Sequence, residues 1–152
     1  MSTNNRMPEL LPPLAFLELP EIIQEGNSTR SIGIAARNMY RHQFGQELQW
    51  SGERCVFVAA QEGECRAVAN VLMSGLLERS VPYVHGIVTM QRYRSRGIGS
   101  FLLDNIADFV AAKGYVALDL YPSNAQNMQF YSRLGFSRIL DGTMIWRRPC
   151  LD

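Results

Sequence analysis

The chain has 152 residues, a formal net charge of +1 and a hydrophobic content of 47%. This length accommodates one domain with a buried core, and the hydrophobic content excludes an intrinsically disordered chain. The near-neutral charge gives no indication of a nucleic-acid or membrane-surface partner, and we expect neither.

Cysteine and histidine are both sparse. The cysteines Cys55, Cys65 and Cys150 include no CxxC pair, and their odd number argues against a disulfide framework. With only His42 and His85, no zinc-type ligand spacing can be assembled, so we expect no metal site.

The N-terminal sequence MSTNNRMPELLPPLAF does not fit a signal peptide, because Pro12 and Pro13 interrupt its short apolar run. No apolar run approaches the roughly 20 residues that a membrane helix needs. We therefore expect a cytoplasmic protein. Residues 1–12 are polar and contain proline, which predicts a flexible tail and leaves 13–152 for a single domain.

The first predicted elements are a strand and a helix. LAFLEL, residues 14–19, is a candidate strand. The segment that follows is ambiguous, and a short helix broken at Gly26 is one interpretation. Ser28 or Thr29 can then cap a helix that runs to about Phe44, with its apolar residues on one face.

Two hairpins and a strand-helix-strand unit complete the pattern. Residues 54–60 and 65–76 flank Gly63 and predict a β-hairpin. The remaining predicted elements are a strand over 81–90, a helix over about 97–113, a strand over 115–121, a short helix over 125–134 and a terminal hairpin of FSRIL and TMIWRRP. The order β-α-α-β-β-β-α-β-α-β-β predicts a mixed α/β domain.

The stretch QRYRSRGIGS, Gln91–Ser100, places three arginines and two glycines between a predicted strand and a predicted helix. A helix that starts at Gly97 presents backbone N–H groups with no intrahelical partner, at the positive end of the helix dipole. Gly97 and Gly99 have no Cβ, so a bulky anion can approach the main chain, and Arg94 and Arg96 can neutralise it. The pattern favours a diphosphate. The alternative is that the glycines only let the chain turn and the arginines are solvated.

Two common nucleotide-binding motifs do not fit this turn. The P-loop sequence GxxxxGK[ST] is absent. The dinucleotide fingerprint GxGxxG lacks its third glycine, because Leu102 occupies that position. A nucleotide-binding protein is therefore a weaker alternative.

The stretch YRSRGIGSFLL resembles the acetyl-CoA-binding motif Q/R-x-x-G-x-G/A of the GNAT acetyltransferase superfamily, with Arg94, Gly97 and Gly99 in place. A second segment, NAQNMQFYSRLGF, is similar to the family's N-x-x-A-x-x-x-Y-x-x-x-G-F pattern. Asn127 stands where the family has alanine. The matching positions of this second segment are Asn124, Tyr131, Gly135 and Phe136.

The resemblance implies a GNAT-type fold, with a central, mostly antiparallel twisted sheet, a splayed parallel strand pair and about four flanking helices. It also implies acetyl-CoA as cosubstrate, with the pyrophosphate on the amides of the arginine-glycine turn and the pantetheine arm along the preceding strand. The residues it implies for coenzyme binding are Val88, Thr89, Met90, Arg94, Ser95, Arg96, Gly97, Ile98, Gly99, Ser100, Asn124 and Tyr131.

Tyr131 is the general acid that the resemblance implies, because an ordinary tyrosine pKa of about 10 keeps the phenol protonated at neutral pH. Tyr131 also shares a helix face with Met128 and Leu134, so core packing is the alternative role. Asn124 can hydrogen-bond the coenzyme arm or cap its own helix, and both can hold at once.

The general base is where the sequence departs from the family. Gly86 stands where many members carry a carboxylate. Neighbouring His85 is the nearest titratable substitute, although strand alternation directs it to the opposite face unless a β-bulge intervenes. Glu53 and Glu78 are weaker candidates, and a water relay stays open. Gly86 can instead make room for a bulky acceptor.

The resemblance implies that the segment with Met39, Tyr40, Phe44 and Trp50 walls the acceptor side of the site. Tyr40, Phe44 and Trp50 have a spacing that predicts core packing first, although an aromatic side chain there could shape an acceptor pocket. Glu47 would suit a cationic amine, and an exposed, solvated carboxylate is the alternative.

The sequence thus predicts an acetyl-CoA-dependent N-acetyltransferase whose acceptor is an amine of a small molecule or a peptide. A GNAT-like sensor or scaffold that binds acyl-CoA without turnover is the alternative, which Tyr131 disfavours and Gly86 favours. The terminal strand carries Ile145 and Trp146, whose expected exposure predicts a homodimer.

Overall fold

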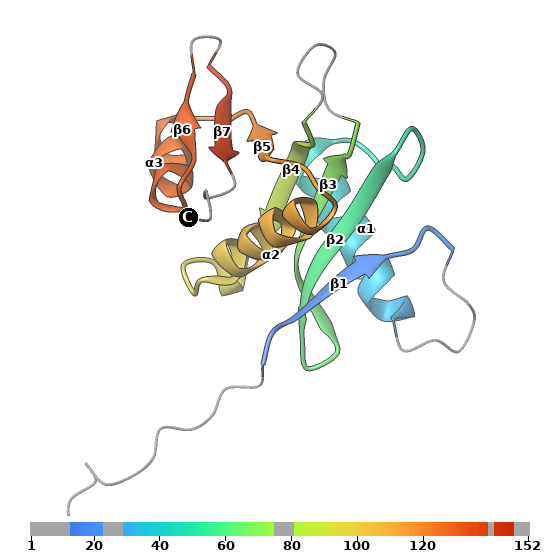
Figure 1. Cartoon of the computed structure of the whole chain (residues 1–152). Helices are drawn as coiled ribbons and strands as arrows, with labels where there is room; N and C mark the ends of the chain where they lie inside the picture. Colours follow the sequence, from blue (N-terminus) through green and yellow to red (C-terminus); the bar gives the residue numbers. More distant parts are fainter. Residues whose placement is uncertain (1–12, 23–28, 75–80, 140–141, 148–152) are drawn as a thin grey trace, which may run out of the picture.

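The computed structural model describes residues 13–22, 29–74, 81–139 and 142–147 of the chain. The predicted tail over 1–12, the cap at Ser28, the candidate base Glu78 and Cys150 lie outside these ranges. Figure 1 shows the arrangement of the elements.

Within the described ranges the predicted elements form with boundaries that differ by a few residues from those expected, and the short helix considered before Gly26 lies mostly outside these ranges. In chain order they are β1 (Ala15–Leu19), α1 (Arg30–Phe44), β2 (Arg54–Gln61), β3 (Glu64–Leu72), β4 (Tyr83–Thr89), the 3-10 helix η2 (Gln91–Tyr93), α2 (Ile98–Ala112), β5 (Ala117–Leu120), α3 (Ala125–Arg133), β6 (Ser137–Arg138) and β7 (Met144–Arg147). The described part of the chain has three α-helices, one fewer than the expected count of about four.

The seven strands form one sheet in the order β1-β2-β3-β4-β5-β7-β6. Every neighbouring pair is antiparallel except β4 and β5, which are parallel. The predicted mostly antiparallel sheet with one parallel pair is confirmed. The β2–β3 hairpin turns at Glu62 and Gly63, which both have positive φ angles, as a tight two-residue turn requires.

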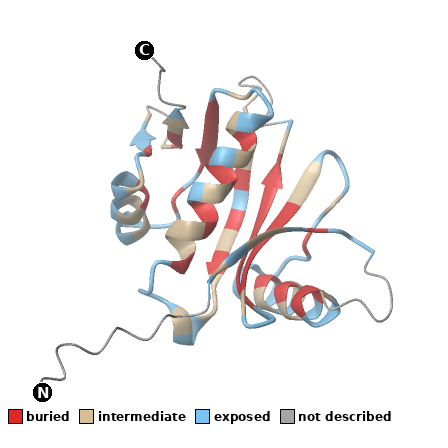
Figure 2. Ribbon diagram, turned by 60° about the horizontal axis from the view of Figure 1, so that its bottom comes forward, coloured by how far each residue is buried: buried red, intermediate tan, exposed pale blue. Residues whose placement is uncertain are grey.

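Helices α1 and α2 cover opposite faces of the sheet (Figure 1). On one face, Ile32, Ala36 and Tyr40 of α1 pack against β2 and β3. On the other face, Leu102 and Ile106 of α2 belong to the larger core cluster. Figure 2 shows the buried residues concentrated on the central strands between these helices. The apolar stripe predicted for α1 is therefore its buried face.

The strand at the C-terminal end is less exposed than expected. β7 lies between β5 and β6, so both of its edges are paired. Ile145 is buried, and Trp146 packs against the larger core, so the expected exposure of Ile145 is wrong. The homodimer stays a prediction, but the exposure of Ile145 no longer supports it. Light scattering at micromolar concentration would test it.

None of the described helices is long and apolar enough to cross a lipid bilayer.

Candidate active site

A gap between two parallel strands positions the site. β4 and β5 pair only at Tyr83–Asp119 and Val84–Leu120. β5 ends at Leu120, whereas β4 continues to Thr89. The edge of β4 over residues 86–89 that faces β5 therefore has no strand partner in the described part of the chain. Backbone groups on such an edge can pair with an extended ligand.

The arginine-glycine turn follows this edge directly. Ser95 and Gly97 have φ angles of +66° and +80°, and Gly97 is the N-cap of α2. The first helical hydrogen bond runs from the Phe101 N–H to the Gly97 carbonyl, 3.0 Å long. The amides of residues 98–100 thus precede the helical hydrogen-bond ladder, at the positive end of the helix dipole. This geometry favours an anion at the turn.

A cleft of about 760 Å³ extends from the β4 edge over the turn to α3. It contains every residue predicted to bind the coenzyme except Met90 and Arg96. The side chain of Arg96 lies instead over the Tyr93 ring, 5.6 Å from its centroid. Residues of the cleft that sequence reasoning missed are Gln43, Ile87, Tyr93, Ser123, Gln126, Asn127, Phe130 and Arg133.

Two arginines line the cleft, and a third lies beside its residue Tyr93. The Nε of Arg94 donates to the Thr89 carbonyl at 3.1 Å, which holds the guanidinium close to the end of β4. Arg133 enters the cleft from α3. The Arg66 guanidinium stacks over Tyr93 at 3.8 Å and is neutralised by Glu64 at 2.7 Å. Arg94 and Arg133 are therefore the side chains placed to neutralise a phosphate in the cleft.

Helix α3 carries Tyr131, which lines the cleft. Tyr131 is only 8% exposed and packs against Phe130 and Phe136, with ring centroids 5.2 and 6.0 Å away. Burial raises the pKa of its phenol above the ordinary value, so the phenol stays protonated at neutral pH. Both roles considered for Tyr131, core packing and a place at the cleft, are thus compatible with its position.

Asn124 and Asn127 fix the start of α3. The Asn124 side chain accepts a hydrogen bond from the Asn127 backbone N–H at 2.8 Å, so the predicted helix cap is confirmed. The Asn127 amide donates to Ser123 Oγ at 2.6 Å. Asn127, which replaces the family's alanine, thereby gains a structural partner and lines the cleft.

A second, smaller cavity of about 170 Å³ adjoins the cleft and lies between α1, β4 and the end of β5. Gln43, Ile87, Ser123, Asn127 and Tyr131 line both spaces. A ligand in the small cavity and a ligand in the cleft would therefore meet along these five residues, which include Tyr131.

A β-bulge in β4 turns His85 toward this small cavity. Asn70 of β3 pairs with Gly86 and Val71 pairs with Val84, so His85 is an extra residue in the strand. The bulge anticipated near Gly86 is confirmed, and His85 lines the cavity. The edge of the Tyr83 ring contacts the His85 ring, with centroids 5.2 Å apart. Partial burial, and then the charge of Arg54, lower the pKa of His85, so its imidazole is neutral at pH 7.

Side chains of α1 fill the space beside Gly86. A Cβ on Gly86 would lie 2.8 Å from the Phe44 ring and 3.0 Å from the Tyr40 hydroxyl. The expectation that Gly86 makes room for a bulky acceptor is therefore wrong. Tyr40 is buried and burial raises its pKa, so its hydroxyl is not a substitute for the missing carboxylate.

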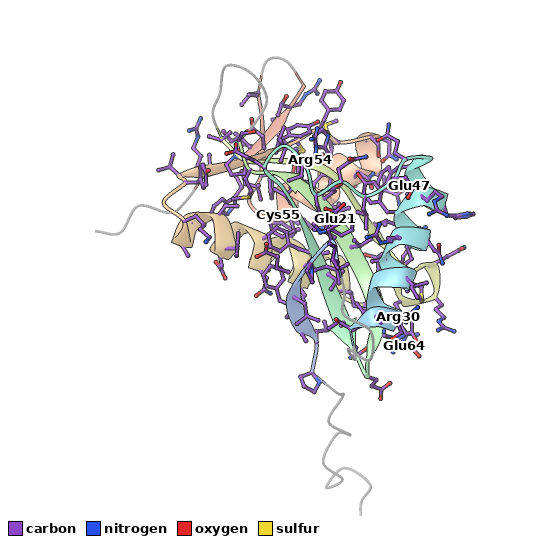
Figure 3. The ribbon with its side chains drawn as sticks, turned by 90° about the vertical axis from the view of Figure 1, so that its right-hand side faces the viewer. Glu21, Arg30, Glu47, Arg54, Cys55 and Glu64 are labelled. Atoms are coloured by element: carbon purple, nitrogen blue, oxygen red, sulfur yellow. The ribbon has the colours of Figure 1, made fainter. Side chains whose placement is uncertain are left out.

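The other candidates on the acceptor side have different places. Glu47 is exposed and forms two hydrogen bonds with Arg41, at 2.6 and 3.1 Å. Glu53 lines neither cavity, and Trp50 packs against the α1-side core and donates to the Leu19 carbonyl. Figure 3 shows Glu47 and Arg54 near one end of the sheet and Arg30 and Glu64 near the other. No group of three His, Cys, Asp or Glu side chains that could hold a metal ion lies within the described ranges.

These features suit an extended ligand that carries a phosphate group. Residues 22–136 match the acetyltransferase (GNAT) family, and the chain belongs to this family. Among proteins with curated functions, none matches the sequence.

Solved structures of acetyltransferases have the same fold. The ribosomal-protein-S18-alanine N-acetyltransferase from Escherichia coli is 18% identical, with a TM-score of 0.66, over 92% of this chain and 97% of that one. An aminoglycoside 6'-N-acetyltransferase complexed with coenzyme A is 14% identical, with a TM-score of 0.68, over 91% and 99% of the two chains. Ard1 from Thermoplasma volcanium is 14% identical, with a TM-score of 0.64, over 90% and 99%. At these identities the likeness shows the fold.

Proposed function

We propose that the protein is an acetyl-CoA-dependent N-acetyltransferase in which a primary amine attacks the thioester directly and Tyr131 is the general acid. The observation that carries the proposal is the place of Tyr131, which lines both the coenzyme-sized cleft and the small cavity beside it. The cleft is the coenzyme site, and the small cavity is the acceptor site.

The chain supplies the groups that a coenzyme A diphosphate requires. The amides of Ile98, Gly99 and Ser100 precede the hydrogen-bond ladder of α2, and these residues line the same cleft as Arg94 and Arg133. The unpaired edge of β4 over residues 86–89 is open to the amide groups of a pantetheine arm. A coenzyme A thioester bound there supplies an activated acyl carbon at the Tyr131 end of the cleft.

Tyr131 then has a defined role in transfer. As the acceptor nitrogen forms a bond to the acyl carbon, the bond from that carbon to sulfur breaks, and the Tyr131 hydroxyl donates its proton to the departing sulfur. The raised pKa of Tyr131 keeps this proton available at neutral pH.

The acceptor amine must also lose a proton. His85 lines the acceptor cavity, and its lowered pKa leaves the ring nitrogen free to accept that proton at pH 7. We assign His85 as the general base on this ground. A water relay to bulk solvent is the competing route.

The comparisons support an amine as acceptor. The Escherichia coli relative acts on the alanine of ribosomal protein S18, and another acts on the 6' amine of an aminoglycoside. Both are N-acetyltransferases, although their acceptors differ.

A screen of primary amines tests the proposal. The full chain is incubated with acetyl-CoA and each amine, and released thiol and acetylated amine are both measured. We expect thiol release that requires the amine. Binding of acetyl-CoA without release for any amine would favour the acyl-CoA sensor instead, and absence of binding would reject both.

A further inference from the structure

Within the described part of the chain, the residues that line the acceptor cavity carry no charged side chain. Its residues are Gln43, Phe44, Val84, His85, Gly86, Ile87, Leu120, Tyr121, Ser123, Asn127 and Tyr131. The only titratable groups among them are the imidazole and the two phenols, and the pKa shifts of His85 and Tyr131 favour their neutral forms. These residues thus offer no carboxylate to a polycation, whereas their apolar and aromatic side chains suit an uncharged body.

Phe44 and Gly86 fit together as one wall of this cavity. The tip of the Phe44 ring occupies the volume that a side chain on residue 86 would need, because a Cβ there would lie 2.8 Å from Cε2 and Cζ. The Tyr40 ring supports the Phe44 ring from one turn earlier in α1, with centroids 4.6 Å apart. Phe44 thus has a defined position although it is the last residue of the helix.

The remaining surface of Phe44 faces open space. Phe44 is 37% exposed, which is much more than its supporting neighbour Tyr40 at 3%. Phe44 lines the acceptor cavity and does not line the coenzyme cleft. A change at Phe44 should therefore alter the acceptor space and leave the coenzyme site intact.

We propose that Phe44, seated against Gly86, is the specificity-determining residue of the acceptor site and restricts it to compact primary amines with an uncharged, apolar or aromatic body. This inference rests on the proposed function, since it takes the small cavity as the acceptor site. The small volume of about 170 Å³ favours a compact acceptor, and the uncharged lining residues disfavour a polycation.

The test measures amine binding and turnover separately. Dissociation constants are measured by calorimetry on the full chain saturated with coenzyme A, for phenethylamine, the larger 1-naphthylethylamine and the polycation spermidine. The wild type should bind phenethylamine more tightly than the other two. Phe44→Ala should shift the preference between the naphthyl and phenyl amines toward the naphthyl amine by about 10- to 200-fold, the range for small volume changes in an apolar pocket.

Ile34→Ala is the matched control, because Ile34 is an exposed apolar residue of the same helix. It should leave the preference and the coenzyme affinity unchanged. A Phe44→Ala variant with the wild-type preference, or a wild type that binds spermidine most tightly, would overturn the inference.

A folding measurement isolates the fit between the two residues. Gly86→Ala should lower the Tm, because its Cβ meets the Phe44 ring, and it should lower the Tm less when introduced into Phe44→Ala. Equal losses of Tm in the two backgrounds would contradict the fit between Phe44 and Gly86.

The proposed function and the restriction by Phe44 fail in different ways. Amine binding as expected without acetyl transfer rejects the proposed function alone. Efficient acetylation of spermidine by the wild type rejects the restriction by Phe44 alone.

Discussion

A Cβ on Gly99 would lie 3.3 Å from Thr89 Oγ1, so the first turn of α2 packs closely against the last residue of β4. The φ angle of Gly99 is not positive, unlike that of Gly97, so an L side chain is allowed there by backbone conformation. A small side chain at residue 99 is therefore tight but tolerable, whereas an acidic one would place an anion where the coenzyme diphosphate is proposed to bind.

We predict that coenzyme A raises the Tm of the wild type and does not raise that of Gly99→Asp. A ligand at 100 times its dissociation constant stabilises the native state by about 2.7 kcal/mol, which a thermal-shift measurement resolves easily. Gly99→Ala is the control and should keep most of the shift. A full shift in the Asp variant would contradict the diphosphate site.

Tyr131→Phe separates catalysis from packing. The change removes one hydroxyl and keeps the ring contacts with Phe130 and Phe136. If the hydroxyl protonates the leaving sulfur, the single-turnover rate should fall by about 100- to 10,000-fold, with acetyl-CoA affinity nearly unchanged. If Tyr131 only packs, the rate should stay within a few fold of the wild type.

Tyr115→Phe provides the comparison for Tyr131, because Tyr115 packs against the same core but lines neither cavity. It should be near wild type in both rate and affinity. A similar small loss in both variants would remove Tyr131 from the acid role.

Most of the strand and helix order was predictable because each element has a local signal. The glycine of the first hairpin is the clearest case: Gly63 lies at the turn where the sequence predicts it and has a positive φ angle. The cleft was predictable as well, because the arginine-glycine turn and the second motif are both local in sequence. Most of the residues predicted to bind the coenzyme line this single cleft.

The acceptor side was not predictable in the same way, because it depends on contacts between distant segments. Nothing local to Gly86 shows that the ring of Phe44, 42 positions earlier in the chain, takes its side-chain volume. The orientation of His85 depends on a bulge that is visible only in the register of β3 and β4. The burial of Ile145 likewise depends on β7 being flanked by β5 and β6.

Asn70 should be the most sensitive polar residue of the sheet. It is 2% exposed, and its side chain accepts from the Gln49 N–H at 2.8 Å and donates to the carbonyls of Gln49 and Cys55 at 2.9 and 3.1 Å. Asn70→Ala leaves these backbone groups without a partner, so we expect a loss of about 1–3 kcal/mol in the free energy of unfolding. Denaturant titration measures it.

Asn70→Asp is the informative second variant for that position. The aspartate can still accept from Gln49 but cannot donate to the two carbonyls. It should be at least as destabilised as Asn70→Ala at neutral pH, because a buried charge replaces a satisfied amide. Near-wild-type stability of both variants would show that the segment around Gln49 is held by other contacts.

The pH dependence of turnover tests His85 as the base. Burial and then the Arg54 charge lower the pKa of His85 below its ordinary value of about 6.5. A base acts when deprotonated, so kcat/KM should rise with pH through this lowered pKa and level off above it. Loss of the acceptor amine's own proton gives a separate rise at higher pH, which depends on the amine chosen.

Two variants assign the lower rise to His85. His85→Gln should abolish it and leave the rise of the amine in place. Arg54→Gln removes one of the two causes that depress the pKa, so it should move the lower rise to higher pH. The rise should still lie below the ordinary histidine pKa, because partial burial remains the larger cause of the lowered pKa.

Arg41→Gln is the control. It removes an exposed arginine paired with Glu47 and should leave the pH profile unchanged. A lower rise that persists in His85→Gln, or that does not move in Arg54→Gln, would assign proton removal to solvent water.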